Sequence, residues 1–220
     1  MIKKPKRVQT FGEELGNGIS HGLMAFLGIA ILIVLLVRSY DGPHIAGAII
    51  YGISVTLLYI FSCIYHIWPN NFVKWKIFKR FDHISIYLLI GGTYSPILLT
   101  LPTIQNTILG SNLTFGELIF MIEWILIAIG ITFKAIWLNK FHWIHVIIFL
   151  VLGWSAMFFI NQIYKFDIGF FWIIIAGGLC YTVGVIFYAI SKIKWFHFTW
   201  HFFTIFGTVL HALAILLYLY

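Results

Sequence analysis

Seven long stretches of apolar residues, separated by short polar connections, dominate the sequence. A membrane-spanning helix needs about 17–25 mostly apolar residues, and each stretch meets this requirement. With approximate ends, the predicted segments are residues 19–37, 44–68, 84–101, 115–138, 143–164, 168–190 and 198–220. The connections carry turn and helix-breaking residues, such as those at 41–43 and 69–71. We therefore predict an all-α polytopic membrane protein with a single seven-helix transmembrane domain over residues 1–220.

The composition excludes an ordinary soluble domain. Apolar residues make up 61% of the chain and charged residues 10%, against about 45–50% and about 25% in soluble globular proteins. The net charge of +7 does not indicate nucleic-acid binding, because the basic residues are spread over short runs between the apolar segments. Cys63 and Cys180 lie in separate apolar segments and are predicted to be buried helix residues rather than a disulfide or a CxxC pair.

The positions of lysine and arginine predict how the chain is oriented. Cytoplasmic loops of membrane proteins carry an excess of these residues. If the N-terminus is inside, only Arg38 and Lys165 fall on the outer side. The other basic residues fall on the inner side: Lys3, Lys4, Lys6, Arg7, Lys74, Lys76, Lys79, Arg80, Lys134, Lys140, Lys192 and Lys194. We therefore expect a cytoplasmic N-terminus and an outer C-terminus.

Four segments are predicted to bring polar side chains to one depth near the cytoplasmic side. Ionisable groups within a membrane span are costly and mark functional sites. Ser62 and His66 lie four residues apart at the inner end of the second segment, and Asp82 opens the third. His197 and His201 lie in the first turns of the seventh segment. The first segment carries its polar residues toward the same side: Glu14, Asn17, Ser20 and His21.

This set of residues suits a metal site. Two histidines at i and i+4 can direct both imidazoles at one ion, as in zinc proteases, and His66 would add a third nitrogen. Zinc sites with three protein ligands and a water are of the catalytic type, and zinc lowers the pKa of that water to roughly 7. Asp82 would be a direct ligand or would hold the water. Two alternatives stay open: interfacial histidines that only bond loops, and another metal such as iron, copper or nickel.

The remaining polar residues are predicted to lie outside this site. His211 is ten residues beyond His201, about 15 Å deeper along a helix, and is expected to be a core hydrogen-bonding histidine. The others are expected to be structural or interfacial, or have no assigned role: His44, Glu117, Glu123, His142 and His145. Pairs of glycines at 91–92 and 177–178 are predicted to allow close approach of helices.

Four motifs in this order resemble those of the hemolysin III family, the bacterial branch of the progestin and adipoQ receptor family. That group belongs to a wider superfamily of membrane hydrolases that includes alkaline ceramidases. The motifs extend over nearly the whole chain and read Glu14-x-x-Asn17-x-x-x-His21, Ser62-x-x-x-His66, Phe81-Asp82-His83 followed by Gly92-Thr93-Tyr94-Ser95-Pro96, and His197-x-x-x-His201 with His211 ten residues on.

The resemblance implies a zinc ion bound by His66, His197 and His201, with Asp82 and Ser62 as catalytic residues. It also implies a location in the bacterial plasma membrane. Further polar residues of the motifs are expected to support the site: Glu14, Asn17, His21 and His211. Receptors of the family carry an N-terminal partner-binding domain, whereas only about 18 residues precede the first predicted segment here, so receptor signalling is not implied.

Three functions follow from these predictions. The first is a zinc-dependent hydrolase of a lipid amide or ester. The second is a non-enzymatic membrane-homeostasis or sensor protein in which zinc only joins helices. The third is a pore-forming haemolysin, which the sequence disfavours because the chain is hydrophobic throughout and shows no cleavable signal peptide. Membrane lipid is the expected environment and substrate, and no nucleic acid or protein partner is indicated.

Overall fold

The computed structural model describes residues 7–138, 140–190 and 192–220, and over these ranges it contains helices and no β-strand. The helices are α1 (Phe11–Arg38), α2 (Gly42–Ile67), α3 (Lys79–Thr100), α4 (Phe115–Ile136), α5 (His142–Gly153), α6 (Ile160–Phe166), α7 (Ile168–Ala189) and α8 (Phe196–Tyr218). A π-helical turn (Lys74–Phe78) precedes α3, 3-10 turns cover Pro102–Ile104 and Ser155–Phe159, and α5 and α6 together form one span. Seven helical stretches are thus long and apolar enough to cross a membrane, which confirms the predicted fold class.

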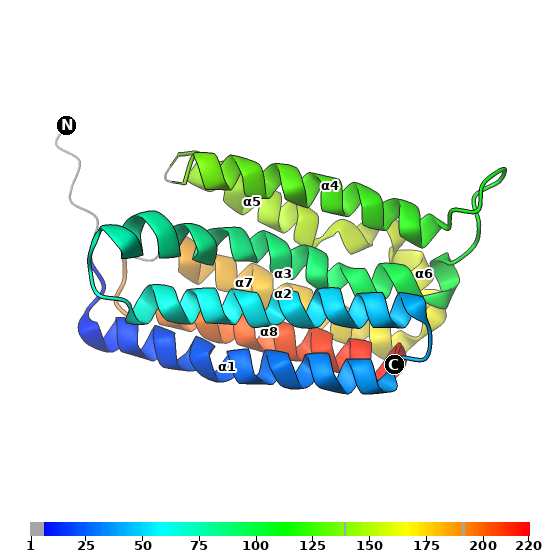
Figure 1. Cartoon of the computed structure of the whole chain (residues 1–220), viewed down its shortest axis with the longest axis horizontal. Coiled ribbons are helices and arrows are strands. Elements are labelled where there is room, and N and C mark those ends of the chain that lie inside the picture. Colours follow the sequence, from blue (N-terminus) through cyan, green and yellow to red (C-terminus); the bar gives the residue numbers. More distant parts are fainter. Residues whose placement is uncertain (1–6, 139, 191) are drawn as a thin grey trace.

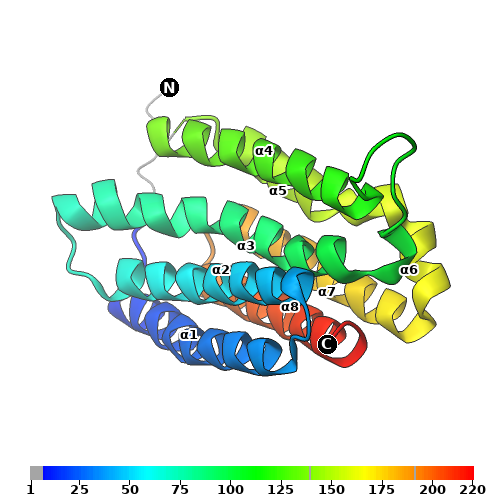
Figure 2. The same ribbon diagram turned by 45° about the vertical axis from the view of Figure 1, so that its right-hand side comes forward.

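The helices lie side by side along the longest axis of the molecule (Figures 1 and 2). Helix α2 packs between α1 and α3, and α8 packs against α7 and α1. Helix α4 packs mainly on α3 and lies with α5 at the edge of the bundle. The starts of α1, α3 and α8 consequently meet the ends of α2 and α4 at one end of the bundle.

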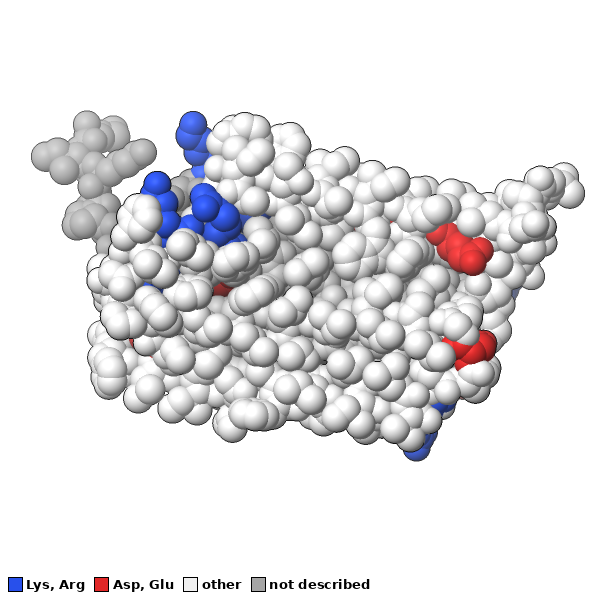
Figure 3. Space-filling view, in the orientation of Figure 1, with Lys and Arg blue, Asp and Glu red and all other residues white. Residues whose placement is uncertain are grey.

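Lysine and arginine side chains gather at this end in Figure 3, whereas the acidic side chains visible in that view are mostly at the other. We call the first the basic end and the second the far end. This separation of basic and acidic side chains matches the distribution of lysine and arginine from which the orientation was predicted. Lys3, Lys4 and Lys6 lie outside the described residues. The cytoplasmic position of the basic end stays a prediction.

Helix α1 begins at Phe11, ahead of the predicted start of the span at residue 19. The reason is a capping box, in which Thr10 accepts from the Glu13 N–H and the Glu13 carboxylate accepts from the Thr10 N–H. The additional residues make about two turns and include Glu14 and Asn17. These two polar residues are therefore held on a regular helix at the basic end.

The fifth span is interrupted within the membrane, whereas the sequence predicted a single segment over residues 143–164. Helix α5 ends at Gly153, and a 3-10 stretch leads to α6. The Tyr94 hydroxyl of α3 donates to the Gly153 carbonyl at 2.8 Å and accepts from the Ala156 N–H at 3.1 Å. Backbone groups released by a break in a membrane helix need such partners inside the protein, so Tyr94 stabilises the interruption.

The predicted close approaches occur at three of the four paired glycines, Gly91, Gly92 and Gly177, and a Cβ atom on Gly91 would lie 2.4 Å from Ile127 of α4. A Cβ atom on Gly92 would lie 2.4 Å from Ser54 Cβ of α2, and one on Gly177 would lie 2.3 Å from the His211 ring of α8. A Cβ on Gly178 would meet Trp154 only at 3.5 Å, an ordinary contact distance. Gly92 therefore sets the spacing of α2 and α3.

Replacing Gly92 by alanine should destabilise the protein, because α2 and α3 must separate to admit the new methyl group. We expect a loss of about 1–3 kcal/mol, measured as a lower midpoint of thermal unfolding in detergent. Gly178→Ala is the matched control and should leave the midpoint close to that of the wild type. Equal midpoints for the two variants would contradict the tight contact at Gly92.

Candidate metal centre

Three histidines meet at the basic end of the bundle. His66 lies in the last turn of α2, and His197 and His201 lie in the first two turns of α8. Each offers one ring nitrogen, and these nitrogens all lie within 4.8 Å of one another. His66 and His201 are buried and His197 is partly buried. The structure thus brings together the three ligands that the sequence predicted.

The geometry of these nitrogens fits zinc. The Nε2 atoms of His197 and His201 are 3.2 Å apart. Two nitrogen ligands on a tetrahedral zinc ion, each at about 2.0–2.1 Å from the metal, lie about 3.3–3.4 Å from each other. His66 Nε2 is buried and has no hydrogen-bond partner within the described residues. A buried nitrogen without a partner is rare in proteins, and here it faces two further imidazoles.

The orientation of the His66 ring is set by an acidic residue of α1. The Nδ1–H of His66 donates to Glu14 Oε2 at 2.7 Å, and the Lys74 ammonium lies 3.3 Å from Glu14 Oε1. Because Nδ1 carries the hydrogen, Nε2 has its lone pair free for a metal. Sequence reasoning placed Glu14 near the site but missed Lys74, which it counted only as a topology signal.

Asp82 and Ser62 lie together beside the histidines. The Asp82 carboxylate, in the first turn of α3, faces the Ser62 hydroxyl and is 3.2 Å from His83 Nδ1. Asp82 is not among the residues whose ligand atoms all lie within 4.8 Å of one another. Both predicted roles for Asp82, direct ligand and contact through water, stay predictions.

The first-helix motif contributes further unpaired polar atoms. The His21 ring stacks on that of His201, with ring centroids 3.6 Å apart. Both ring nitrogens of His21 and Oδ1 of Asn17 are buried without a hydrogen-bond partner in the part of the chain that the structure describes, whereas the Asn17 amide donates to Gln9. These atoms can hydrogen-bond to water or to a bound molecule at the site.

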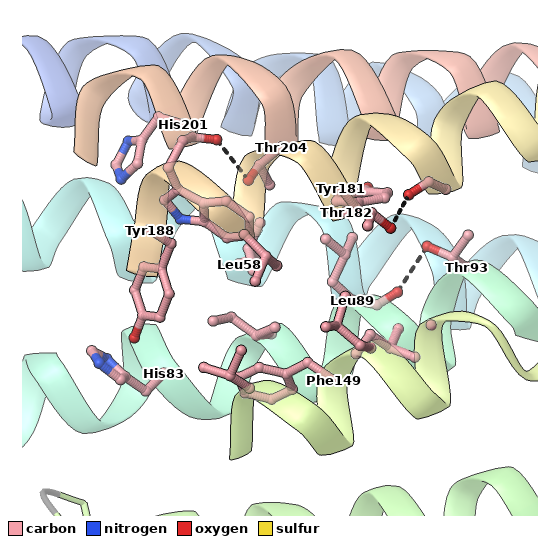
Figure 4. Close-up of a pocket in the computed structure, with 18 of the residues that line it drawn as sticks. Leu58, His83, Leu89, Thr93, Phe149, Tyr181, Thr182, Tyr188, His201 and Thr204 are labelled. Atoms are coloured by element: carbon pink, nitrogen blue, oxygen red, sulfur yellow. Dashed lines mark hydrogen bonds between the residues drawn. The ribbon is translucent and has the colours of Figure 1, made fainter. Parts of the chain in front are cut away.

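A cavity of about 120 Å³ extends from the histidines into the membrane interior between α3, α5, α7 and α8. In Figure 4, His201 and His83 lie at one end of the space, and Thr93 and Thr182 lie toward the other. Most of its wall is apolar, formed by residues such as Leu89 and Phe149. The cavity therefore joins the polar site to an apolar interior.

His211 lies at the deep end of the cavity, where its Nε2 is 3.1 Å from the Ile174 carbonyl. It is a buried hydrogen-bonding histidine, as predicted. The other candidate residues have local partners: His145 with Tyr87, His44 with Asp41, and Glu117 with Thr114. Glu123 is buried near Ser155, and the side chain of His142 lies outside the described part of the chain.

Comparisons with known proteins show which family the chain belongs to. A family model described as "Haemolysin-III related" matches residues 9–212. The chain is 33% identical to "Hemolysin-3" of Bacillus cereus over 99% of this chain and 97% of the relative. It is also 33% identical to the "Hemolysin-3 homolog" of Bacillus subtilis over 95% of each chain. The human "Monocyte to macrophage differentiation factor" is 27% identical over 94% of this chain and 85% of that protein.

No solved structure matches the chain significantly. The family match and the seven spans make it an integral membrane protein, in agreement with the predicted location in the plasma membrane. The chain belongs to the haemolysin-III-related family of membrane proteins.

Proposed function

We propose that the protein is a zinc-dependent membrane hydrolase that cleaves a lipid amide or ester. The observation that carries this proposal is a group of three histidines, two of which, His197 and His201, line an apolar cavity. A catalytic zinc site needs three protein ligands and an open position, and a lipid substrate needs an apolar binding space. The proposal is supported because the three histidines and the apolar cavity are adjacent.

The residues around the histidines have complementary tasks in such a reaction. Zinc, when bound, would polarise the substrate carbonyl and activate a water. The Asp82 carboxylate would orient that water, accept its proton, and pass the proton to the leaving amine or alkoxide as the bond to the carbonyl carbon breaks. The Ser62 hydroxyl, beside Asp82, would donate a hydrogen bond to the carboxylate. The stacked ring of His21 would hold the polar part of the substrate through its unpaired nitrogens.

The cavity supports an acyl chain as the apolar part of the substrate. From His201 to His211, both of which line it, α8 advances by ten residues or about 15 Å. The surface that the cavity exposes is mostly apolar, so a hydrocarbon chain is favoured over a polar one. The carbonyl would lie at the histidines and the chain would extend toward His211.

A non-enzymatic role for the metal has one observation in its favour. His66 belongs to α2, while His197 and His201 belong to α8. A bound metal would therefore join two helices that are distant in sequence. In that case the metal would stabilise the fold, and Asp82 would be dispensable for function.

The first test is metal content. Purified wild type should carry about one zinc ion per chain, determined by elemental analysis, and His66→Ala and His201→Ala should each lose it. His145→Ala is the control, because His145 bonds to Tyr87 away from the site, and it should retain the metal. Equal zinc in all four proteins would exclude the proposed centre.

The second test is activity. Zinc-loaded protein should release fatty acid from at least one lipid amide or ester in a panel presented in mixed micelles. Asp82→Asn should keep its zinc but lower the rate by about 10²- to 10⁴-fold, the usual contribution of a general base. If wild type with full zinc occupancy releases no fatty acid from any lipid at high protein concentration, the structural role of the metal is favoured.

A further inference from the structure

Two adjacent carboxylates in the first turn of α1 reach the two helices that carry the histidines. Glu14 bonds to His66 on α2, and Glu13 Oε1 accepts the Trp195 N–H at the start of α8, at 2.7 Å. Consecutive residues of an α-helix point about 100° apart, and α1 packs against both α2 and α8. Side chains of one helical turn of α1 can therefore bond to both α2 and α8.

We propose that Glu13 and Glu14 are positioning residues of the metal centre, Glu14 for the His66 ring and Glu13 for the pair His197 and His201. The inference rests on the proposed metal site. It assigns to the start of α1 the task of fixing the relative placement of the three ligands before any metal arrives.

Glu14 contacts His66 in the way that carboxylates contact the metal-binding histidines that they orient. It accepts from Nδ1 of His66 and leaves Nε2, which is buried and without a partner in the described chain, for the ion. Lys74, only 1% exposed, lies 3.3 Å from the other Glu14 oxygen and donates to the His66 carbonyl at 3.4 Å. This ammonium offsets the charge of the carboxylate in a site with little water and restricts Glu14 to one orientation.

The contact of Glu13 fixes the beginning of α8. Trp195 has a left-handed backbone (φ 68°) and supplies no side-chain cap to the helix. A bulky residue in this region is uncommon and needs support from its surroundings. The Glu13 carboxylate provides it through the Trp195 N–H, and the same carboxylate is held by Arg7 and Thr10. His197 follows two residues later, so this anchor sets the rotation of the first turns of α8.

A second capping box in the molecule provides a control that distinguishes anchoring of α8 from ordinary helix capping. Thr114 and Glu117 at the start of α4 make the same reciprocal bonds as Thr10 and Glu13. Glu117 lies at the far end and contacts none of the three histidines among its described hydrogen bonds. Replacement of Glu117 therefore removes a cap alone, whereas replacement of Glu13 removes a cap and the anchor of α8.

The experiment uses full-length protein in detergent, with zinc affinity measured by competition against a chelating dye. The variants are Glu14→Ala, Glu14→Gln, Glu13→Ala and Glu117→Ala. Glu14→Ala should bind zinc about 10- to 100-fold more weakly, as expected for loss of an outer-shell partner. Glu14→Gln keeps an acceptor oxygen and should lose less. Glu13→Ala removes the acceptor for the Trp195 N–H and should weaken zinc binding about tenfold, whereas Glu117→Ala should bind as the wild type does.

Two further readouts separate positioning from general destabilisation. The thermal midpoint of the metal-free protein should fall in both Glu13→Ala and Glu117→Ala, because both lose a cap, but only Glu13→Ala should also lose zinc affinity. The visible spectrum of the cobalt-substituted protein should change in Glu14→Ala and stay unchanged in Glu117→Ala, because it reports the geometry of the ligands.

Zinc affinity at the wild-type level in Glu14→Ala and Glu13→Ala would overturn the inference while leaving the metal centre intact. An equal loss of affinity in Glu117→Ala would also overturn it, because general destabilisation would then explain the effect. Absence of zinc and cobalt binding in the wild type would instead remove the proposed function, and this inference with it.

Discussion

The interior of a bilayer contains no water, so each polar group that enters it needs a partner within the protein. Much of the structure follows from this requirement. Tyr59 donates to the Thr208 hydroxyl at 2.7 Å, and Thr93 donates to the Leu89 carbonyl of its own helix. Tyr94 donates to the Gly153 carbonyl, which the break in the fifth span leaves free. Against this background, unpaired polar atoms are informative. Several of them gather around the histidines at the basic end: Asn17 Oδ1, both nitrogens of His21, His66 Nε2 and His201 Nδ1.

The length of the apolar stretches was sufficient to predict the seven spans, and spacing along one helix was sufficient to pair two of the histidines, because both are local properties. His197 and His201 share a helix face at i and i+4, and His66 was added by depth alone. The sequence could not reveal the partners of Glu13 and Glu14, which are 182 and 52 residues away. Those contacts depend on which helices are neighbours. The break in the fifth span was missed for a similar reason, since it depends on a hydroxyl supplied by α3.

The helices contribute to the site in two ways, and α3 and α8 contribute in both. Helices α1, α2, α3 and α8 supply the polar side chains at the basic end, and α3, α5, α7 and α8 supply much of the wall of the cavity. Changes in α5 or α7 can therefore alter the shape of the binding space without touching a ligand.

The order of the three histidines along the chain has a consequence for biogenesis. His66 leaves the ribosome early, in the second span, whereas His197 and His201 belong to the last one. Chains are made from the N-terminus, so the group of three imidazoles cannot form until α8 has entered the bilayer and packed between α1 and α7. During synthesis, Glu14 and Lys74 can already hold His66 in place. In the proposed metal centre, metal loading would then be the closing step of assembly, and a nascent chain without its final helix would lack two of the three histidines.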